Sequence, residues 1–108
     1  MTAIALDEAE DDLQRAFDYY ELQRAGLGGE LVHEFRRGVE RIIEFPNAWQ
    51  RLDETYRRYR LHRFPYGIVY RVDSANNQIV IVSDHAPQPH ARVLAADEMT
   101  VRNHLRVS

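Results

Sequence analysis

The 108-residue sequence contains no cysteine and no lysine. The absence of cysteine excludes disulfides, thiolate catalysis and cysteine-ligated zinc sites, and it fits a reducing compartment. No apolar run approaches the roughly 20 residues that a membrane-spanning helix needs. The first residues also lack the basic region of a secretory signal peptide. We therefore expect a cytoplasmic protein that has no membrane contact.

Several chemical motifs are missing as well. No glycine loop follows a predicted strand, because Gly26, Gly28 and Gly29 lie between two predicted helices, and this excludes the common phosphate-binding loops. His85 and His90 stand five residues apart with no accompanying carboxylates, which is a weak metal-binding spacing. No nucleophile–base motif stands out. We expect neither a metal nor a cofactor.

The charged residues are unevenly distributed along the chain. Residues 1–54 contain 13 Asp and Glu against 6 Arg, whereas residues 55–108 contain 4 against 8, although the net charge is only -3. This asymmetry predicts one acidic and one basic face. The exclusive use of arginine fits codon bias in a GC-rich genome. The functional alternative is forked contact of arginine with phosphates or carboxylates.

The pattern of the N-terminal half predicts a strand followed by two helices. Thr2–Leu6 is a short apolar stretch that we expect to form a strand. Asp7 and Glu10 have the spacing of a capping box, and apolar residues then recur at helical intervals. Gly26 is suited to the left-handed conformation that ends a helix. The pattern predicts a first helix that stops near this glycine.

A second helix is predicted from near Gly29 to Pro46, and the short glycine linker makes the two helices an antiparallel pair. Residues 47–54 look irregular, and Trp49 is most simply a core residue over the end of the hairpin.

The C-terminal half changes to a period of two. Tyr56–Arg63, Tyr66–Val72 and Gln78–Asp84 are rich in Tyr, Val and Ile, and short turns separate them, which predicts an antiparallel meander. Helices followed by strands indicate an α+β fold, in which a helical hairpin packs on a mostly antiparallel sheet of three to four strands.

The tail carries weaker signals. His85–His90 is a proline-broken loop, and Thr100 is suited to cap a last short helix containing Val101 and Leu105. No linker divides the chain, so we expect residues 1–108 to form one domain, with the pattern least defined over 91–108.

The first long strand concentrates arginines. Alternation puts Arg58, Arg60 and His62 on one face. The other face carries Arg57, Tyr59, Leu61 and Arg63. A row of cationic and titratable groups suits contact with a polyanion. The simpler interpretation is a solvated face whose arginines pair with the acidic helices.

The order of short motifs resembles the RelE/ParE toxins of bacterial type II toxin–antitoxin (plasmid stabilisation) systems. Tyr19-Tyr20-Glu21 followed by Gly26-Leu27-Gly28 is similar to their helical hairpin. The segment from Arg57 through Phe64-Pro65-Tyr66 to Val72 resembles their first long strand and the hairpin after it. Ile79–Val82, followed by His85, is similar to their last strand and its exit. The resemblance covers roughly residues 3–90.

The resemblance implies a growth-arresting toxin that binds a cognate antitoxin, with a hetero-oligomer as the inactive form. RelE-like members cut mRNA on the ribosome, and ParE-like members poison DNA gyrase. Arg58 and Arg60 match two basic positions of the nuclease class, but the next basic position is Gly67. The paired arginines expected after His85 are missing, and no tyrosine follows Tyr70.

This departure favours a ParE-like gyrase inhibitor. The alternatives are a RelE-like mRNA endoribonuclease (an mRNA interferase) and a non-toxic binding relative. RNA cleavage would use Arg58, Arg60, His62 and His85 as catalytic residues. In either class, contact with the antitoxin or the target is expected from Arg57, Arg58, Arg60, Arg63, Tyr70 and Arg92.

Overall fold

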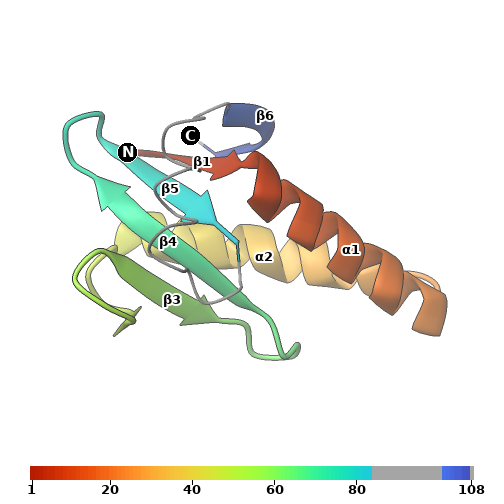
Figure 1. Ribbon diagram of the computed structural model, residues 1–108. Coiled ribbons are helices and arrows are strands. Elements are labelled where there is room, and N and C mark those ends of the chain that lie inside the picture. Colours follow the sequence, from red (N-terminus) through yellow and green to blue (C-terminus); the bar gives the residue numbers. More distant parts are fainter. Residues whose placement is uncertain (84–100, 108) are drawn as a thin grey trace.

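The computed structural model describes residues 1–83 and the strand Val101–Val107. Within these described residues, two helices and six strands follow one another (Figure 1). The order is β1 (Thr2–Leu6), α1 (Asp7–Gln23), α2 (Leu27–Glu44), β2 (Gln50–Arg51), β3 (Tyr56–Arg60), β4 (Gly67–Asp73), β5 (Gln78–Val82) and β6 (Val101–Val107).

The strands form one sheet with the order β2-β3-β4-β5-β1-β6. Strand β1 pairs with β5 in parallel, and every other neighbouring pair is antiparallel. The four predicted strands are all present, and β2 and β6 extend the sheet at its two edges. The predicted α+β fold with a mostly antiparallel sheet is therefore confirmed.

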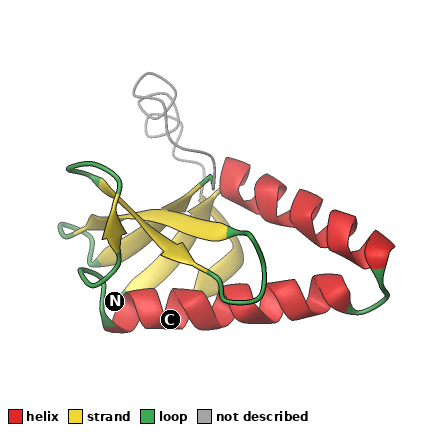
Figure 2. Cartoon of the chain, turned by 90° about the horizontal axis from the view of Figure 1, so that it is seen from below, coloured by secondary structure: helices red, strands yellow, loops and turns green. Residues whose placement is uncertain are grey.

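The helical hairpin covers one face of the sheet (Figure 2). Leu31, Phe35, Val39 and Ile42 recur at helical spacing along α2, and all four are buried in the main core. They pack with the helix-facing side chains of the strands, among them Tyr59, Ile68, Tyr70, Ile79 and Ile81. Within the described part of the chain, no helix is both long and apolar enough to cross a membrane.

The tip of the hairpin is a short turn secured from α1. Gly26 has φ 92°, the left-handed conformation predicted for it. The carboxylate of Glu21 accepts hydrogen bonds from the backbone N–H groups of Gly26 at 2.8 Å and Gly28 at 2.9 Å. It thereby satisfies two amides at the start of α2 that the helix itself leaves without partners.

The predicted capping box is not formed. Strand β1 runs directly into α1, so Leu6 occupies the N-cap position and no side chain caps the helix there. Asp7 is already the first helical residue. It shares the first turn with Glu8 and Glu10, where negative charge stabilises the positive end of the helix dipole.

The predicted C-terminal helix is wrong. Val101–Val107 is strand β6, which pairs antiparallel with β1 through a register irregularity between Ala3 and Ala5. In the sequence Val-Arg-Asn-His-Leu-Arg-Val, a period of two groups Val101, Leu105 and Val107, with Asn103 as the exception, and this is a strand period. The free edge of β1, which no local pattern reveals, supplies the pairing partner.

We predict opposite effects for two adjacent glycines of α2. A Cβ atom on Gly28 would lie 2.7 Å from the carbonyl oxygen of Phe17, whereas one on Gly29 would meet nothing within 4 Å. Gly28→Ala should destabilise the fold by about 2 kcal/mol, because α1 and α2 must separate. Gly29→Ala should be neutral or stabilising by up to about 1 kcal/mol. Urea unfolding of both variants measures the difference, and equal midpoints would contradict the close helix contact.

Candidate functional site

The pairing register collects arginines on the sheet face opposite the helices. On β3 and β4, Arg58 lies opposite Val69, and Tyr56 lies opposite Arg71. Because alternate residues share a face, Arg58, Arg60 and Arg71 all project from the same side. The predicted common face of Arg58 and Arg60 is therefore confirmed, and Arg71 joins them.

The same face also carries a compact apolar cluster. Its buried members come from β1, β3, β4 and β5, namely Ile4, Leu6, Tyr56, Val69, Val80 and Val82. Because these side chains are buried, the exposed part of this face comes from Arg58, Arg60 and Arg71. A cationic surface of this kind suits a partner that presents acidic side chains.

Gly67 gives Arg58 its position. A Cβ atom at residue 67 would overlap Arg58 Nε and would lie 2.9 Å from Arg58 Cζ. The guanidinium of Arg58 therefore lies directly over the glycine, where its Nε is shielded from solvent. A larger side chain at position 67 would require the Arg58 side chain to move from this position.

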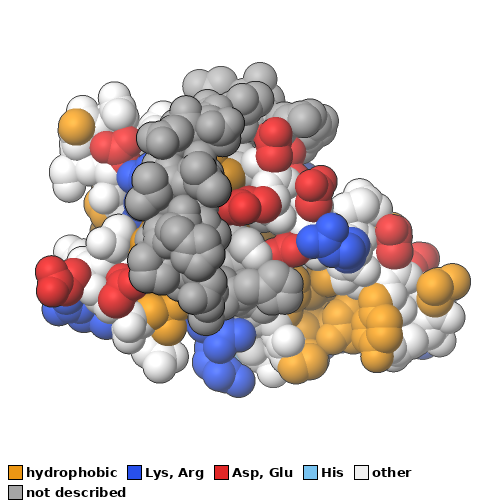
Figure 3. Space-filling model, viewed as in Figure 1, with side chains coloured by type: hydrophobic (Ala, Val, Ile, Leu, Met, Phe, Trp, Pro, Cys, Tyr) orange, Lys and Arg blue, Asp and Glu red, His pale blue; other side chains and the backbone are white. Residues whose placement is uncertain are grey.

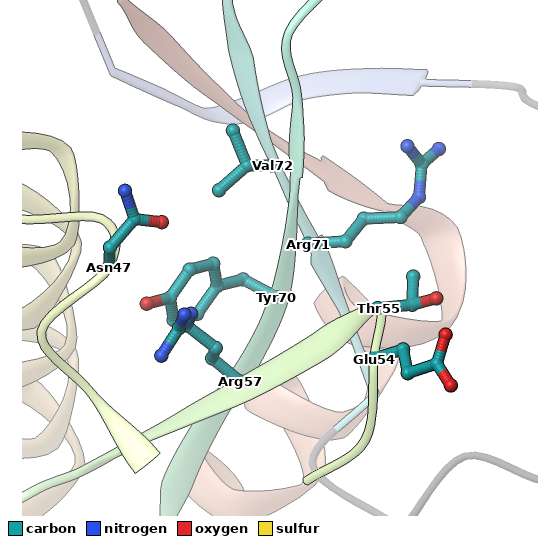
Figure 4. A pocket seen from close by; sticks show the side chains of 7 residues that line it. All are labelled: Asn47, Glu54, Thr55, Arg57, Tyr70, Arg71 and Val72. Carbon is teal, nitrogen blue, oxygen red and sulfur yellow. The ribbon is translucent and has the colours of Figure 1, made fainter. Parts of the chain in front are cut away.

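Arg57 and Tyr70 lie on the other side of the strands, beside a polar cleft of about 290 Å³ (Figure 4). Asn47, Glu54, Thr55, Arg57, Tyr70, Arg71 and Val72 line it. The figure shows Tyr70 and Arg71 leaving β4 in opposite directions, with the Arg57 guanidinium beside the Tyr70 ring. Arg57 donates a hydrogen bond to the Trp49 carbonyl at 2.8 Å.

Tyr70 is a core residue, with 0% of its surface exposed. Its hydroxyl donates a hydrogen bond to the Pro46 carbonyl at 2.6 Å. Burial raises the pKa of Tyr70 to about 12, against a smaller opposing effect of Arg57. Together, Arg57 and Tyr70 attach the segment that follows α2 to the sheet.

Arg63 also makes internal contacts. Its guanidinium pairs with Glu30 and, at 3.4 Å, with Glu34, and it lies 5.5 Å from the centre of the Phe64 ring. The hydrogen bond from Arg63 lowers the pKa of the Glu30 carboxyl. Arg63 thus forms the ion pairs with acidic helix residues that the simpler interpretation of the sequence expects.

His62 does not join Arg58 and Arg60. Strand β3 ends at Arg60, and His62 instead lines a groove of about 340 Å³ between α2 and the end of β3, which we call the α2–β3 groove. Its α2 wall carries His33, Glu34, Arg37 and Arg41. Its other wall carries Tyr59, Leu61, His62 and Arg63.

Two of the candidate residues, His85 and Arg92, lie outside the described residues, as does the proline loop 85–90. Within residues 1–83 and 101–107, no group of three or more His, Cys, Asp or Glu side chains is placed to hold a metal ion. Sequence reasoning missed Arg71 and the α2–β3 groove. Arg71 follows the buried Tyr70 in the alternating pattern of β4, and this was the available signal for it.

The sequence and the fold of this chain are similar to those of known proteins. Residues 4–86 match the family described as ParE toxin of type II toxin-antitoxin system, parDE. A solved structure described as "Chromosomal ParDE TA system from P. aeruginosa" aligns with a TM-score of 0.66 at 22% sequence identity. The alignment covers 77% of this chain and 91% of the other. No curated protein matches the sequence.

We predict that Tyr70→Phe lowers the free energy of unfolding by about 1–2 kcal/mol at neutral pH, because the buried Pro46 carbonyl loses its donor. The pKa of Tyr70 is raised on folding, so its contribution is complete below pH 10 and is lost as the pH rises toward 12. Denaturant unfolding from pH 8 to 12 should show the wild type and the variant converging. A constant difference across this range would contradict the assignment.

Proposed function

The chain belongs to the family of ParE toxins of type II toxin–antitoxin systems, and on this basis we propose that it arrests growth by binding DNA gyrase. In this proposal the chain acts in the bacterial cytoplasm and a cognate antitoxin holds it inactive. Inhibition comes from occupying the target, and no bond of the target is broken by the toxin.

The observation that carries the proposal is the separation of cations from acid–base groups. RNA cleavage needs a general base, a general acid and cations for the developing charge. Arg58 and Arg60 supply cations, but His62 lies in the α2–β3 groove and Tyr70 is buried with its hydroxyl engaged. Among the described residues, the nuclease roles named from the sequence are therefore not gathered on one face.

An exposed apolar surface on α1 supports binding to a large protein. Tyr19 is 60% exposed and Leu22 is 89% exposed, one helical turn apart near the tip of the hairpin. Hydrophobic side chains gather at this end of the hairpin, whereas acidic side chains lie along the rest of α1 (Figure 3). Exposed apolar side chains that lie together favour a protein-binding surface.

The arginine face supports a second, separate contact. Its cations at Arg58, Arg60 and Arg71 suit an acidic antitoxin segment. The target and the antitoxin would then meet different parts of the molecule. Neutralisation would follow from a change in the toxin's shape or from steric exclusion by the bulk of the antitoxin.

A supercoiling assay with purified gyrase tests the proposal. The wild-type chain should inhibit supercoiling at micromolar concentration. Leu22→Ser should weaken inhibition about tenfold by removing an apolar anchor. The matched control is Gln23→Ser, the neighbouring exposed residue, which should inhibit like the wild type. Absence of inhibition by the wild type, or equal inhibition by both variants, would contradict the proposal.

The cluster of Arg58, Arg60 and Arg71 favours the RelE-like alternative, an mRNA interferase that acts on the ribosome. Primer extension on translated mRNA tests it. Codon-specific cuts that vanish in the Arg58→Ala/Arg60→Ala double variant would establish this activity in place of gyrase inhibition. If neither activity nor growth arrest is found, the chain is a non-toxic relative that retains antitoxin binding.

A further inference from the structure

The α2 wall of the α2–β3 groove is cationic. His33, Arg37 and Arg41 recur every four residues, so they form one stripe along the exposed side of α2. Across the groove, Leu61 is buried and presents an apolar surface next to the exposed His62. No function assigned above uses this stripe.

The charges of the stripe are not neutralised from within the described residues. Neither Arg37 nor Arg41 has an ion-pair partner in the part of the chain that the structure describes. The acid that lines the groove, Glu34, pairs with Arg63. The groove therefore presents a net positive surface that attracts an anionic ligand.

The edge of β3 beside the groove is open for strand pairing. Leu52 N–H donates to the Tyr56 carbonyl at 2.9 Å, which shows that the polar backbone groups of Tyr56 face β2. Backbone groups of successive residues in a strand point to opposite edges, so the N–H and C=O groups of Arg60, four residues after Tyr56, point to the same edge as those of Tyr56. Strand β2 ends opposite Arg57 and Arg58, so no described strand lies opposite Arg60.

The spacing of the stripe fits an extended chain. Residues four apart on a helix are separated by about 6 Å along its axis. Alternate residues of an extended strand point to the same side and are separated by about 6.8 Å. An extended segment with acidic residues at alternate positions thus places successive carboxylates near successive cations of the stripe. A helical segment would place carboxylates at a similar spacing, but it would leave the β3 edge without a partner, so the open edge is what favours an extended segment.

We propose that the α2–β3 groove binds an extended segment with alternating acidic residues, which adds a strand to β3 at Arg60. One set of its side chains meets His33, Arg37 and Arg41, and the other set projects toward the face that carries Arg58 and Arg60. In the context of the proposed function this segment belongs to the antitoxin. A partner bound in the groove would then contact residues on both faces of β3.

The test uses the full chain and a fluorescein-labelled, end-capped (Val-Glu)4 peptide, followed by anisotropy. The wild type should bind this peptide, and (Val-Gln)4, which has the same extended shape without the charge, should not bind. Arg37→Gln/Arg41→Gln should weaken binding about tenfold, since two exposed charge pairs are lost. Arg36→Gln, at the adjacent exposed position outside the groove, should change affinity less than about twofold.

Hydrogen exchange tests the strand pairing. The Arg60 amide should exchange more slowly when the (Val-Glu)4 peptide is bound. Unchanged exchange at Arg60, or equal affinity of the double variant and the wild type, would overturn the proposal. Binding of a ten-nucleotide oligo-U in place of the peptide would instead make the groove a nucleic-acid site. None of these measurements involves gyrase, so failure here and failure of supercoiling inhibition are distinguishable.

Discussion

The contact between Tyr59 on β3 and Gly38 on α2 fixes the orientation of the strand that carries the arginines. A Cβ atom on Gly38 would lie 2.8 Å from Tyr59 Cε1, so the glycine allows the tyrosine ring to reach the helix. Trp49 closes over the same ring at a centroid distance of 4.7 Å. Once Tyr59 points to the helices, Arg58 and Arg60 must point away from them. A slip of one residue would exchange the two faces of β3 and bury charge in the core.

Internal pairing divides the arginines into two groups. Arg63 is used within the fold, where it joins the end of β3 to Glu30 and Glu34 of α2. Arg37 and Arg41, one turn apart on α2, have no such partner among the described residues and line the α2–β3 groove. The charge asymmetry of the sequence therefore becomes a basic region around β3 and an acidic N-terminal part of α1, whereas the exposed apolar Tyr19 and Leu22 lie near the other end of α1. In the proposed function, this separation places the target and the antitoxin at different surfaces of the chain.

The elements with a strong local signal were predictable from the sequence. The apolar run of β1, the helical period of α2 and the turn glycine Gly26 each depend on residues close together in the chain. The rest depends on contacts between distant segments. The capping box failed because β1 leads straight into α1 and makes Leu6 the N-cap. His62 left the predicted face because β3 ends two residues before it, and the α2–β3 groove joins residues of α2 to residues after β3, which no local pattern connects.

We propose that this ParE-family chain is a toxin that is neutralised when a partner engages the basic region around β3. This proposal is tested by the growth of cells induced for the chain alone, and of cells induced for the chain together with its cognate antitoxin. We expect growth arrest in the first case and growth in the second. We also expect the Arg37→Gln/Arg41→Gln variant to stay toxic when the antitoxin is present at a level that just rescues cells expressing the wild type. Normal growth of cells that express the wild-type chain alone would contradict the proposal.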